Sequence, residues 1–222
     1  MTRLTALAAL CLALVAGAGW WLTSGSGSTP PDLTFAANAQ EAEQIDTSTI
    51  TEMSIGNPDA AVTVIEYASF TCPHCADFHA SQFKQLKVDY IDTGKINFIY
   101  RDVFFDRFGL WASMLARCGG QDRFFGLTAM LYDKQKDWIG KGDPVGIANE
   151  LRRIGKVAGL GEDQIEACLA DQDKAKTLVA WYQQNAEADD VSSTPTLVIN
   201  GQKYSNMAYA DLKAIIDEKL GN

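Results

Sequence analysis

Residues 62–75 read Val-Thr-Val-Ile-Glu-Tyr-Ala-Ser-Phe-Thr-Cys-Pro-His-Cys, the most informative pattern in the chain. The first nine of these residues are rich in β-branched and aromatic side chains, which predicts a central strand buried on both faces. Thr71 is a good helix N-cap, and Pro73 suits a first turn, where its missing N–H costs nothing. The sequence therefore predicts a strand followed at once by a helix that begins at Cys72.

A second strand completes a βαβ unit. Beyond Cys75, apolar residues recur at helical spacing along one face, and Gly94 is a suitable helix terminator. These apolar residues are Phe83, Leu86 and Tyr90. Residues 96–101, Ile-Asn-Phe-Ile-Tyr-Arg, then have the composition of a strand. Residues 62–101 are therefore predicted to form two parallel strands joined by a right-handed crossover.

Helices and a hairpin make up the rest of the chain. Helical patterns without strands occur over residues 110–118, 123–138, 145–158, 165–169 and 174–188. Strand character returns at residues 196–199 and 202–204, on either side of Asn200-Gly201, which is a strong hairpin signal. Residues 209–220 then form a last amphipathic helix. The predicted class is an α/β fold with an inserted all-helical domain.

The chain divides into four predicted parts. Arg3 precedes an apolar run, so residues 1–22 are expected to be a signal peptide or a signal anchor. The small residues Ala16-Gly17-Ala18 favour cleavage, whereas the length of the run and Trp20-Trp21 favour an anchor. Residues 23–49 lack an apolar period and are expected to form a linker. The α/β domain is assigned to residues 50–105 and 189–222, and the helical insert to residues 106–188.

Composition excludes several classes of protein. Hydrophobic residues make up 47% of the 222 residues, which is enough for a buried core and too many for disorder. The net charge of −9 is spread without long runs, so no nucleic-acid partner is expected. With Cys11 set aside in the apolar run, the cysteines that remain are Cys72, Cys75, Cys118 and Cys168. An even number of cysteines in an exported protein suggests pairing.

Cys72 and Cys75 are the candidate catalytic pair. Two intervening residues bring both sulfurs into the first helical turn, close enough for a disulfide. Cys72 is the expected nucleophile, because free N–H groups and the helix dipole at a helix N-terminus stabilise a thiolate. Cys75, on the apolar face, is the expected resolving thiol. His74 can stabilise the Cys72 thiolate but not a disulfide, which favours an oxidant of other thiols over a reductant.

Other interpretations of these residues stay open. Zinc binding needs more ligands, and the only nearby candidate is His79. A structural disulfide across so short a loop gains little entropy, and His74 can also be an ordinary surface histidine. Glu66 can lie beneath the thiols and relay a proton to Cys75, or it can be exposed at a sheet edge.

On these residues the chain resembles the bacterial DsbA family of thioredoxin-fold proteins over residues 50–220. Residues 70–75 are similar to the active-site segment of that family, and the helical block lies where the family inserts a helical domain. Thr194-Pro195 resembles the family's residue before a cis-proline, although the residues alone allow either isomer. The resemblance implies a thioredoxin fold. It also implies a catalytic set of Cys72, Pro73, His74 and Cys75, with Thr194 and Pro195 as substrate-facing backbone.

The resemblance extends to residues around the pair. Glu66 matches a buried glutamate of the family, whereas His79 stands where the best-known members have a further glutamate. Cys118 and Cys168 resemble an extra pair in the alphaproteobacterial branch. A disulfide between them would stabilise the fold by about 4 kcal/mol in the chain-entropy model; two unpaired buried thiols are the alternative.

The expected activity follows from the pair and from the resemblance. The chain is expected to oxidise reduced, exported client proteins in the periplasm, as a monomer and with no metal or cofactor other than the Cys72–Cys75 disulfide. The resemblance implies a membrane partner similar to the DsbB or VKOR-like quinone reductases, which would reoxidise the chain. A disulfide isomerase or reductase of the same fold, and a non-catalytic chaperone or metal carrier, remain as alternatives.

Overall fold

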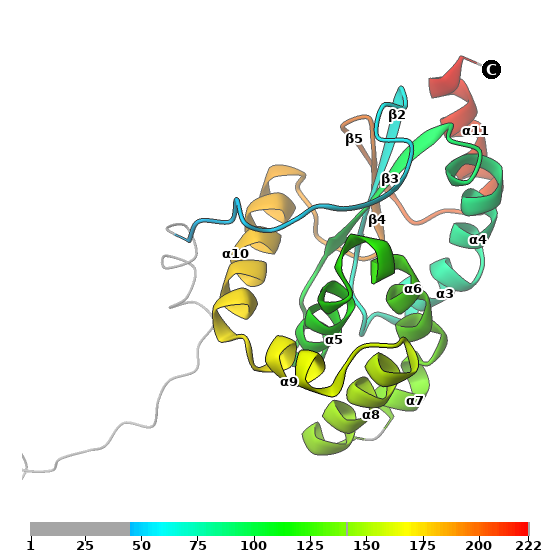
Figure 1. Cartoon of the computed structure of the whole chain (residues 1–222). Coiled ribbons are helices and arrows are strands. Elements are labelled where there is room, and N and C mark those ends of the chain that lie inside the picture. The colour runs from blue at the N-terminus through cyan, green and yellow to red at the C-terminus, as the bar shows by residue number, and fades with distance from the viewer. Residues whose placement is uncertain (1–44, 141, 222) are drawn as a thin grey trace, which may run out of the picture. The chain divides into compact units, whose positions relative to one another are not determined.

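The computed structural model describes residues 45–140 and 142–221, and in this part the strands form one mixed sheet (Figure 1). The strands are β1 (Met53–Gly56), β2 (Val62–Ala68), β3 (Ile96–Asp102), β4 (Thr196–Ile199) and β5 (Gln202–Ser205). Their order across the sheet is β1-β3-β2-β4-β5, with β2 and β3 parallel and the other neighbours antiparallel. The predicted βαβ unit is confirmed by the parallel pairing of β2 with β3.

The central strand β2 is buried on both faces, as its composition predicts. Val64 belongs to the main core on one face, whereas Tyr67 packs with Val198 and Tyr182 on the other. Glu66 is fully buried, because β2 lies between β3 and β4. Of the two alternatives for Glu66, exposure at a sheet edge is therefore wrong.

The helix after β2 differs from the prediction at its start. It is α3 (Pro73–Ala80), with Cys72 as the N-cap residue and no side-chain capping bond. Thr71 is not the cap, because its hydroxyl instead donates to the Asp106 carboxylate at 2.8 Å. The predicted N-cap is wrong by one residue, and the correction places the Cys72 backbone itself at the helix entrance.

The same helix is also interrupted. It breaks at Ser81 before α4 (Gln82–Leu86) and the π-helical turn η2 (Lys87–Ile91). The Ser81 hydroxyl bonds the Asp77 carbonyl at 2.6 Å, while the Ser81 N–H bonds the Phe78 carbonyl. A serine hydroxyl that competes for a helix carbonyl in this way disturbs the α-helical ladder. The single continuous helix expected up to Gly94 is thus wrong.

Helices alone fill the described residues between β3 and β4. They are α5 (Arg107–Cys118), α6 (Gly120–Asp133), α7 (Gln135–Ile139), α8 (Pro144–Val157), α9 (Glu162–Ala170) and α10 (Gln172–Ala188). The single helix predicted over residues 123–138 is divided at Lys134, whose backbone leaves the helical region. The predicted class, an α/β fold with an all-helical insertion, is confirmed.

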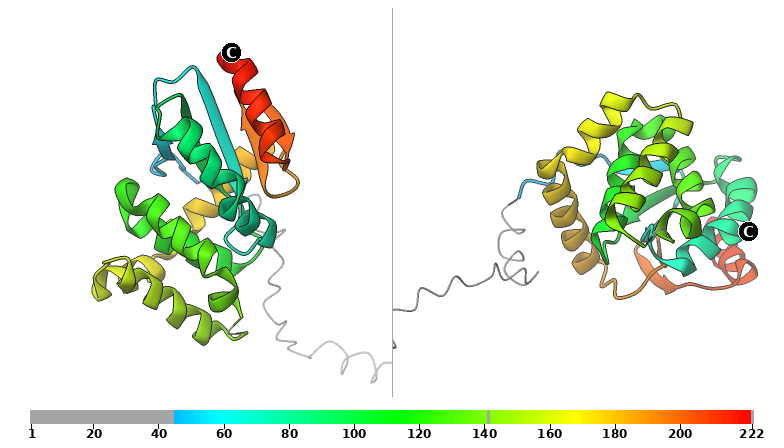
Figure 2. Two further views of the ribbon diagram at one scale, coloured as in Figure 1. Left: turned by 90° about the vertical axis from the view of Figure 1, so that its right-hand side faces the viewer. Right: turned by 90° about the horizontal axis from the view of Figure 1, so that it is seen from below.

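Three groups of helices surround the sheet. Figure 1 shows α10 on one side of the strands and α3, α4 and α11 (Tyr209–Leu220) on the other. In the left view of Figure 2, α11 and the α3–α4 segment lie side by side, and in the right view α5–α9 lie in front of the strands. A disulfide between Cys118 and Cys168 joins α5 to α9.

The two edge strands of the sheet, β1 and β5, complete the fold. Asn200 and Gly201 have positive φ angles of 47° and 80°, which is the type I′ geometry of a two-residue hairpin, so the predicted hairpin is confirmed. Strand β1 was not predicted, because four residues at a sheet edge carry too short a pattern.

The signal peptide or anchor at residues 1–22 and most of the linker lie outside the described residues. Within those residues no helix has the length and apolar character needed to cross a bilayer.

Candidate functional site

Cys72 and Cys75 lie together at the junction of β2 and α3. The Cys72 N–H donates to the Ser69 carbonyl at 3.0 Å, which closes the turn out of the strand. Both cysteines are free thiols; Cys72 is 7% exposed and Cys75 is completely buried. Only Cys72 is therefore within reach of another protein.

The two thiols have opposite acidities. The pKa of Cys72 is lowered to about 5, first by the hydrogen bond with the Cys75 thiol and further by the Thr194 side chain and the N–H groups of Cys75 and His74. Partial burial of Cys72 opposes this shift. Burial raises the pKa of Cys75 far above its ordinary value, and the Cys72 hydrogen bond and the Glu66 charge add to the effect. At neutral pH the pair therefore holds one thiolate and one thiol, as the sequence predicts for a nucleophile and a resolving cysteine.

A titration checks this division. We expect the ultraviolet absorbance of the reduced protein to report one thiolate forming near pH 5, and this transition to vanish in Cys72→Ser. Because the folded-state pKa of Cys72 lies below the unfolded value of about 8.5, the thiolate stabilises the folded reduced protein. That stability is lost as the pH falls from about 8 to 5, so the melting temperature of the reduced form should fall relative to that of the oxidised form. A transition near pH 8 would contradict the assignment.

The dipeptide between the cysteines is exposed. Pro73 lies in the first helical turn, as predicted, and is itself the first helical residue, and His74 is exposed. The imidazole of His74 has no hydrogen bond to any described residue, so the backbone N–H of His74 is what reaches the Cys72 sulfur. A contribution of the imidazole to thiolate stability stays a prediction.

Thr194 and Pro195 face the thiols from the loop before β4. The peptide bond between them is cis. The Thr194 carbonyl oxygen lies 3.6 Å from the Cys72 sulfur and accepts a hydrogen bond from it when the thiol is protonated, which places this backbone directly opposite Cys72. An extended client segment can pair with such a backbone while its own cysteine approaches Cys72.

Glu66 and His79 form a buried pair on the core side of the thiols. His79 Nε2 lies 2.8 Å from Glu66 Oε2, and both side chains are at most 4% exposed. The other oxygen, Glu66 Oε1, is buried without a partner among the described residues. The imidazole is stacked on Tyr132 at 4.3 Å and packs against Phe83 at 4.6 Å. Glu66 is thus buried, as one of the two interpretations of the sequence requires, and it is bonded to His79. A proton-relay role for Glu66 stays a prediction.

Sequence reasoning missed the roles of His79 and Gln135. His79 follows Cys75 by four residues and therefore shares its helical face, a signal that could have placed it beneath the thiols. Gln135, on α7, donates from Nε2 to the carbonyls of Phe70 and Cys72, both at 2.9 Å. No local pattern indicates Gln135, because its partners are more than 60 residues away in the chain. The helical insert thereby holds the backbone of the dithiol loop.

The described residues contain no cluster of three or more His, Cys, Asp or Glu side chains arranged to hold a metal ion.

A helix-terminal dithiol that faces a cis-proline beside a mixed sheet defines the class of thioredoxin-fold dithiol proteins. Residues 48–218 match the family described as Thioredoxin, and the chain belongs to this family.

Known relatives narrow the assignment within the family. A "Putative protein-disulfide oxidoreductase" of Rickettsia bellii is 34% identical over 174 residues, which are 76% of this chain and 64% of that protein. The solved alpha-DsbA1 of Wolbachia pipientis superposes with a TM-score of 0.71 at 27% identity and covers 77% of this chain and 92% of its own. A "protein-disulfide isomerase" from Novosphingobium aromaticivorans superposes with a TM-score of 0.70 at 25% identity. The superposed region is 77% of this chain and 98% of that protein.

These comparisons identify the chain as a DsbA-like member of the thioredoxin family. The matched region spans less than two thirds of the length of the Rickettsia bellii relative. The expected family and fold are confirmed.

Proposed function

We propose that this chain is an exported protein-disulfide oxidoreductase that transfers the Cys72–Cys75 disulfide to reduced client proteins. The observation that carries the proposal is the low pKa of Cys72 beside the high pKa of Cys75. A stabilised thiolate stabilises the reduced pair, so electrons flow from the client into this protein. The names of the relatives support the same chemistry.

The transfer takes two steps. A client thiolate attacks the Cys72 sulfur, a mixed disulfide forms, and Cys75 leaves and takes up a proton. A second client thiol, once deprotonated, attacks the client sulfur of the mixed disulfide, and Cys72 leaves as a thiolate. The client gains one disulfide and gives up two electrons, which reduce the Cys72–Cys75 pair. The low pKa makes Cys72 a good leaving group in the second step.

The other site residues have supporting roles. Thr194 and the cis Pro195 would pair with client backbone, and Pro73 and His74 would shape the helix entrance around Cys72. Glu66 would exchange a proton with Cys75, because its free oxygen lies in the same buried region and its charge acts on that thiol. The disulfide Cys118–Cys168 is structural in this scheme, since it joins two helices of the insert.

The setting of the activity is part of the proposal. The chain would work as a monomer in the periplasm, either free after signal cleavage or tethered to the inner membrane by residues 4–22. No metal or cofactor takes part beyond the disulfide itself. A membrane quinone reductase similar to the DsbB or VKOR-like proteins would reoxidise the pair.

Equilibrium with glutathione tests the direction of transfer. With a Cys72 pKa of about 5, the thiolate stabilises the reduced form at pH 7 by about 3 kcal/mol, which raises the potential by about 60 mV. We expect a potential above about −200 mV, measured as the fraction of reduced pair across a series of glutathione ratios. A value near the roughly −270 mV of thioredoxin would indicate a reductant instead.

A disulfide isomerase is the second candidate, because one structural relative carries that name. An isomerase would reactivate a protein with scrambled disulfides when no oxidant is present and its own pair is reduced. We expect the reduced chain to be slow in this assay and the oxidised chain to be fast with a fully reduced client. The reverse order would favour isomerase activity.

A further inference from the structure

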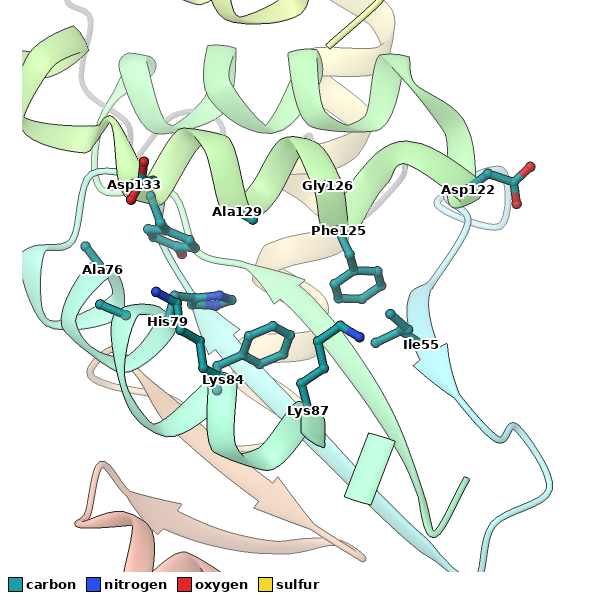
Figure 3. Close-up of a pocket in the computed structure, with 13 residues that line it drawn as sticks. Ile55, Ala76, His79, Lys84, Lys87, Asp122, Phe125, Gly126, Ala129 and Asp133 are labelled. Carbon is teal, nitrogen blue, oxygen red and sulfur yellow. The ribbon is translucent and has the colours of Figure 1, made fainter. Parts of the chain in front are cut away.

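A pocket of about 440 Å³ lies beside the dithiol site but does not include it. It lies between α3 and α4 on one side and α6 of the helical insert on the other. Figure 3 shows His79 in the middle of this space, with Ala129 on α6 above it and Lys84 on α4 below. Neither thiol lines the pocket, so a molecule held there would leave Cys72 open to a client.

The pocket exists because the facing helices carry small side chains. α3 presents Ala76 and Ala80, one turn apart, and α6 presents Gly126 and Ala129. A Cβ atom added at Gly126 would meet no atom of another segment within 4 Å. Bulky side chains at these four positions would interlock the two helices, as packed helices normally do. The sequence therefore keeps this space open.

Aromatic rings form much of the pocket wall. Phe83 on α4 and Phe125 and Tyr132 on α6 line it. The imidazole of His79 lies among them, with its ring centroid 4.3 Å from that of Tyr132 and 4.6 Å from that of Phe83. Walls of this kind favour a flat apolar ligand, because its rings can stack on them.

His79 contributes a polar atom to this apolar wall. The residue is only 6% exposed. Its Nε2 lies 2.8 Å from Glu66 Oε2, whereas its Nδ1 has no hydrogen bond to any described residue. A buried ring nitrogen costs free energy while it lacks a partner. A ligand group in the pocket that bonds Nδ1 would remove this cost.

Lysines bring positive charge to the pocket. Lys84 and Lys87 line it, and Figure 3 shows both side chains rising from α4 and η2 toward the space. Lys87 is paired with Asp92, whereas Lys84 has no ion pair with any described residue. At the rim, Asp122 points away from the space in Figure 3, and the Asp133 side chain is 75% exposed. The charge that faces the pocket without a counterion is therefore a cation, which favours an anionic ligand.

We propose that this pocket binds a small aromatic carboxylate. Its rings would stack on Phe83 and Phe125, and its carboxylate would accept hydrogen bonds from His79 Nδ1 and Lys84 Nζ. An imidazole that donates from both nitrogens is a cation. Two cations, His79 and Lys84, would then face two carboxylates, those of Glu66 and the ligand. The site does not depend on the proposed function, because neither thiol takes part in it.

The two histidines of the chain make the site visible by nuclear magnetic resonance. The probe is 2-naphthoate, a flat bicyclic carboxylate, added to the full chain labelled with nitrogen-15. We expect saturation with a Kd below about 1 mM and a shift of the His79 Nδ1 resonance toward that of a protonated nitrogen. His74, between the two cysteines, should keep its resonances and serves as the internal reference. A shift of His74 without one of His79 would mean that the probe binds at the dithiol face, and would overturn the proposal.

Two further probes separate the rings from the charge. 2-Naphthamide has the same rings without the negative charge, and we expect it to bind at least about tenfold more weakly than 2-naphthoate. Acetate has the charge without the rings, and it should not shift His79 at the same concentration. Equal affinity for 2-naphthoate and either of these probes would show that the pocket does not select an aromatic carboxylate.

Variants of the pocket complete the test. Lys84→Met keeps the aliphatic stem and should weaken the binding of 2-naphthoate about fivefold while leaving that of 2-naphthamide unchanged. Lys95→Met removes an exposed lysine that does not line the pocket and should change neither affinity. Gly126→Leu fills the pocket from α6 and should abolish the binding of both naphthyl probes.

Gly126→Leu also separates the pocket from the dithiol. This variant should oxidise a reduced client within about twofold of the wild-type rate, which shows that it is folded. Undiminished binding of 2-naphthoate to Gly126→Leu would place the site elsewhere and overturn the proposal, but would leave the proposed function standing. The proposed function fails separately if the wild-type chain does not oxidise a reduced client.

Discussion

Replacement of Cys72 by Ser is expected to reduce the oxidation of a reduced, unfolded ribonuclease to the uncatalysed background. Ser cannot form the mixed disulfide, and Cys75 is completely buried with a pKa raised far above its ordinary value, so Cys75 cannot take over as nucleophile. The recovery of ribonuclease activity over time, with the variant supplied under oxidising conditions, measures the loss. Activity that remains near the wild-type level in Cys72→Ser would refute the assignment of this cysteine.

Matched cysteine variants show that the effect belongs to this sulfur. Cys75→Ser keeps the nucleophile but has no resolving thiol, so it should accumulate mixed disulfides that a gel without reductant reveals. The double variant Cys118→Ser/Cys168→Ser removes the disulfide between α5 and α9 and should keep a high specific activity, although it should unfold at a lower denaturant concentration. A double variant as inactive as Cys72→Ser would place essential chemistry in the insert.

The sequence was most informative where a local pattern and a local structure coincide. The run of residues 62–68, the proline in the first helical turn and the Asn200-Gly201 turn each have a short-range physical cause, and all three are found where expected. The order of the two acidities also follows from local position, because Cys72 stands at a helix entrance and Cys75 one turn inside. These features support Cys72 as the nucleophile of the proposed function without knowledge of the rest of the chain.

The features that sequence reasoning missed depend on contacts between distant segments. Ser81 ends α3 through a bond of its own hydroxyl, which competes with a helical pattern that is otherwise continuous. Gln135 supports the dithiol loop from a helix that packs beside it only in the folded chain. The burial of Glu66 was ambiguous, because it depends on which strands flank β2, and strand order is set by the whole topology. The bond between His79 and Glu66 could not be predicted either, because it joins a helix to a strand and depends on the same topology.

A second consequence of long-range packing is a buried ion pair that joins the insert to the sheet. Arg117 on α5 donates from Nε and Nη2 to Asp102 Oδ2 at 2.9 and 2.7 Å, and from Nη1 to the Thr51 carbonyl at 2.9 Å. Both side chains are at most 4% exposed. The guanidinium also lies over the rings of Phe124 and Trp181. One side chain therefore connects β3, the segment before β1 and three helices.

Loss of Arg117 should be among the most destabilising single changes in the chain. Arg117→Met keeps most of the aliphatic stem but leaves the Asp102 carboxylate buried without its cation, and we expect a loss of about 3–5 kcal/mol in the free energy of unfolding. Urea unfolding followed by circular dichroism measures this loss.

Two further variants separate charge from packing. Arg152→Met breaks an exposed ion pair with Glu166 and should leave the urea midpoint of unfolding almost unchanged. The double variant Asp102→Leu/Arg117→Met removes both charges and should recover much of the stability, because the cost lies in the unpaired carboxylate. A small loss in Arg117→Met would mean that the guanidinium does not hold the insert on the sheet. A large loss with no recovery in the double variant would mean that the packing of the guanidinium on the rings, and not its charge, does so.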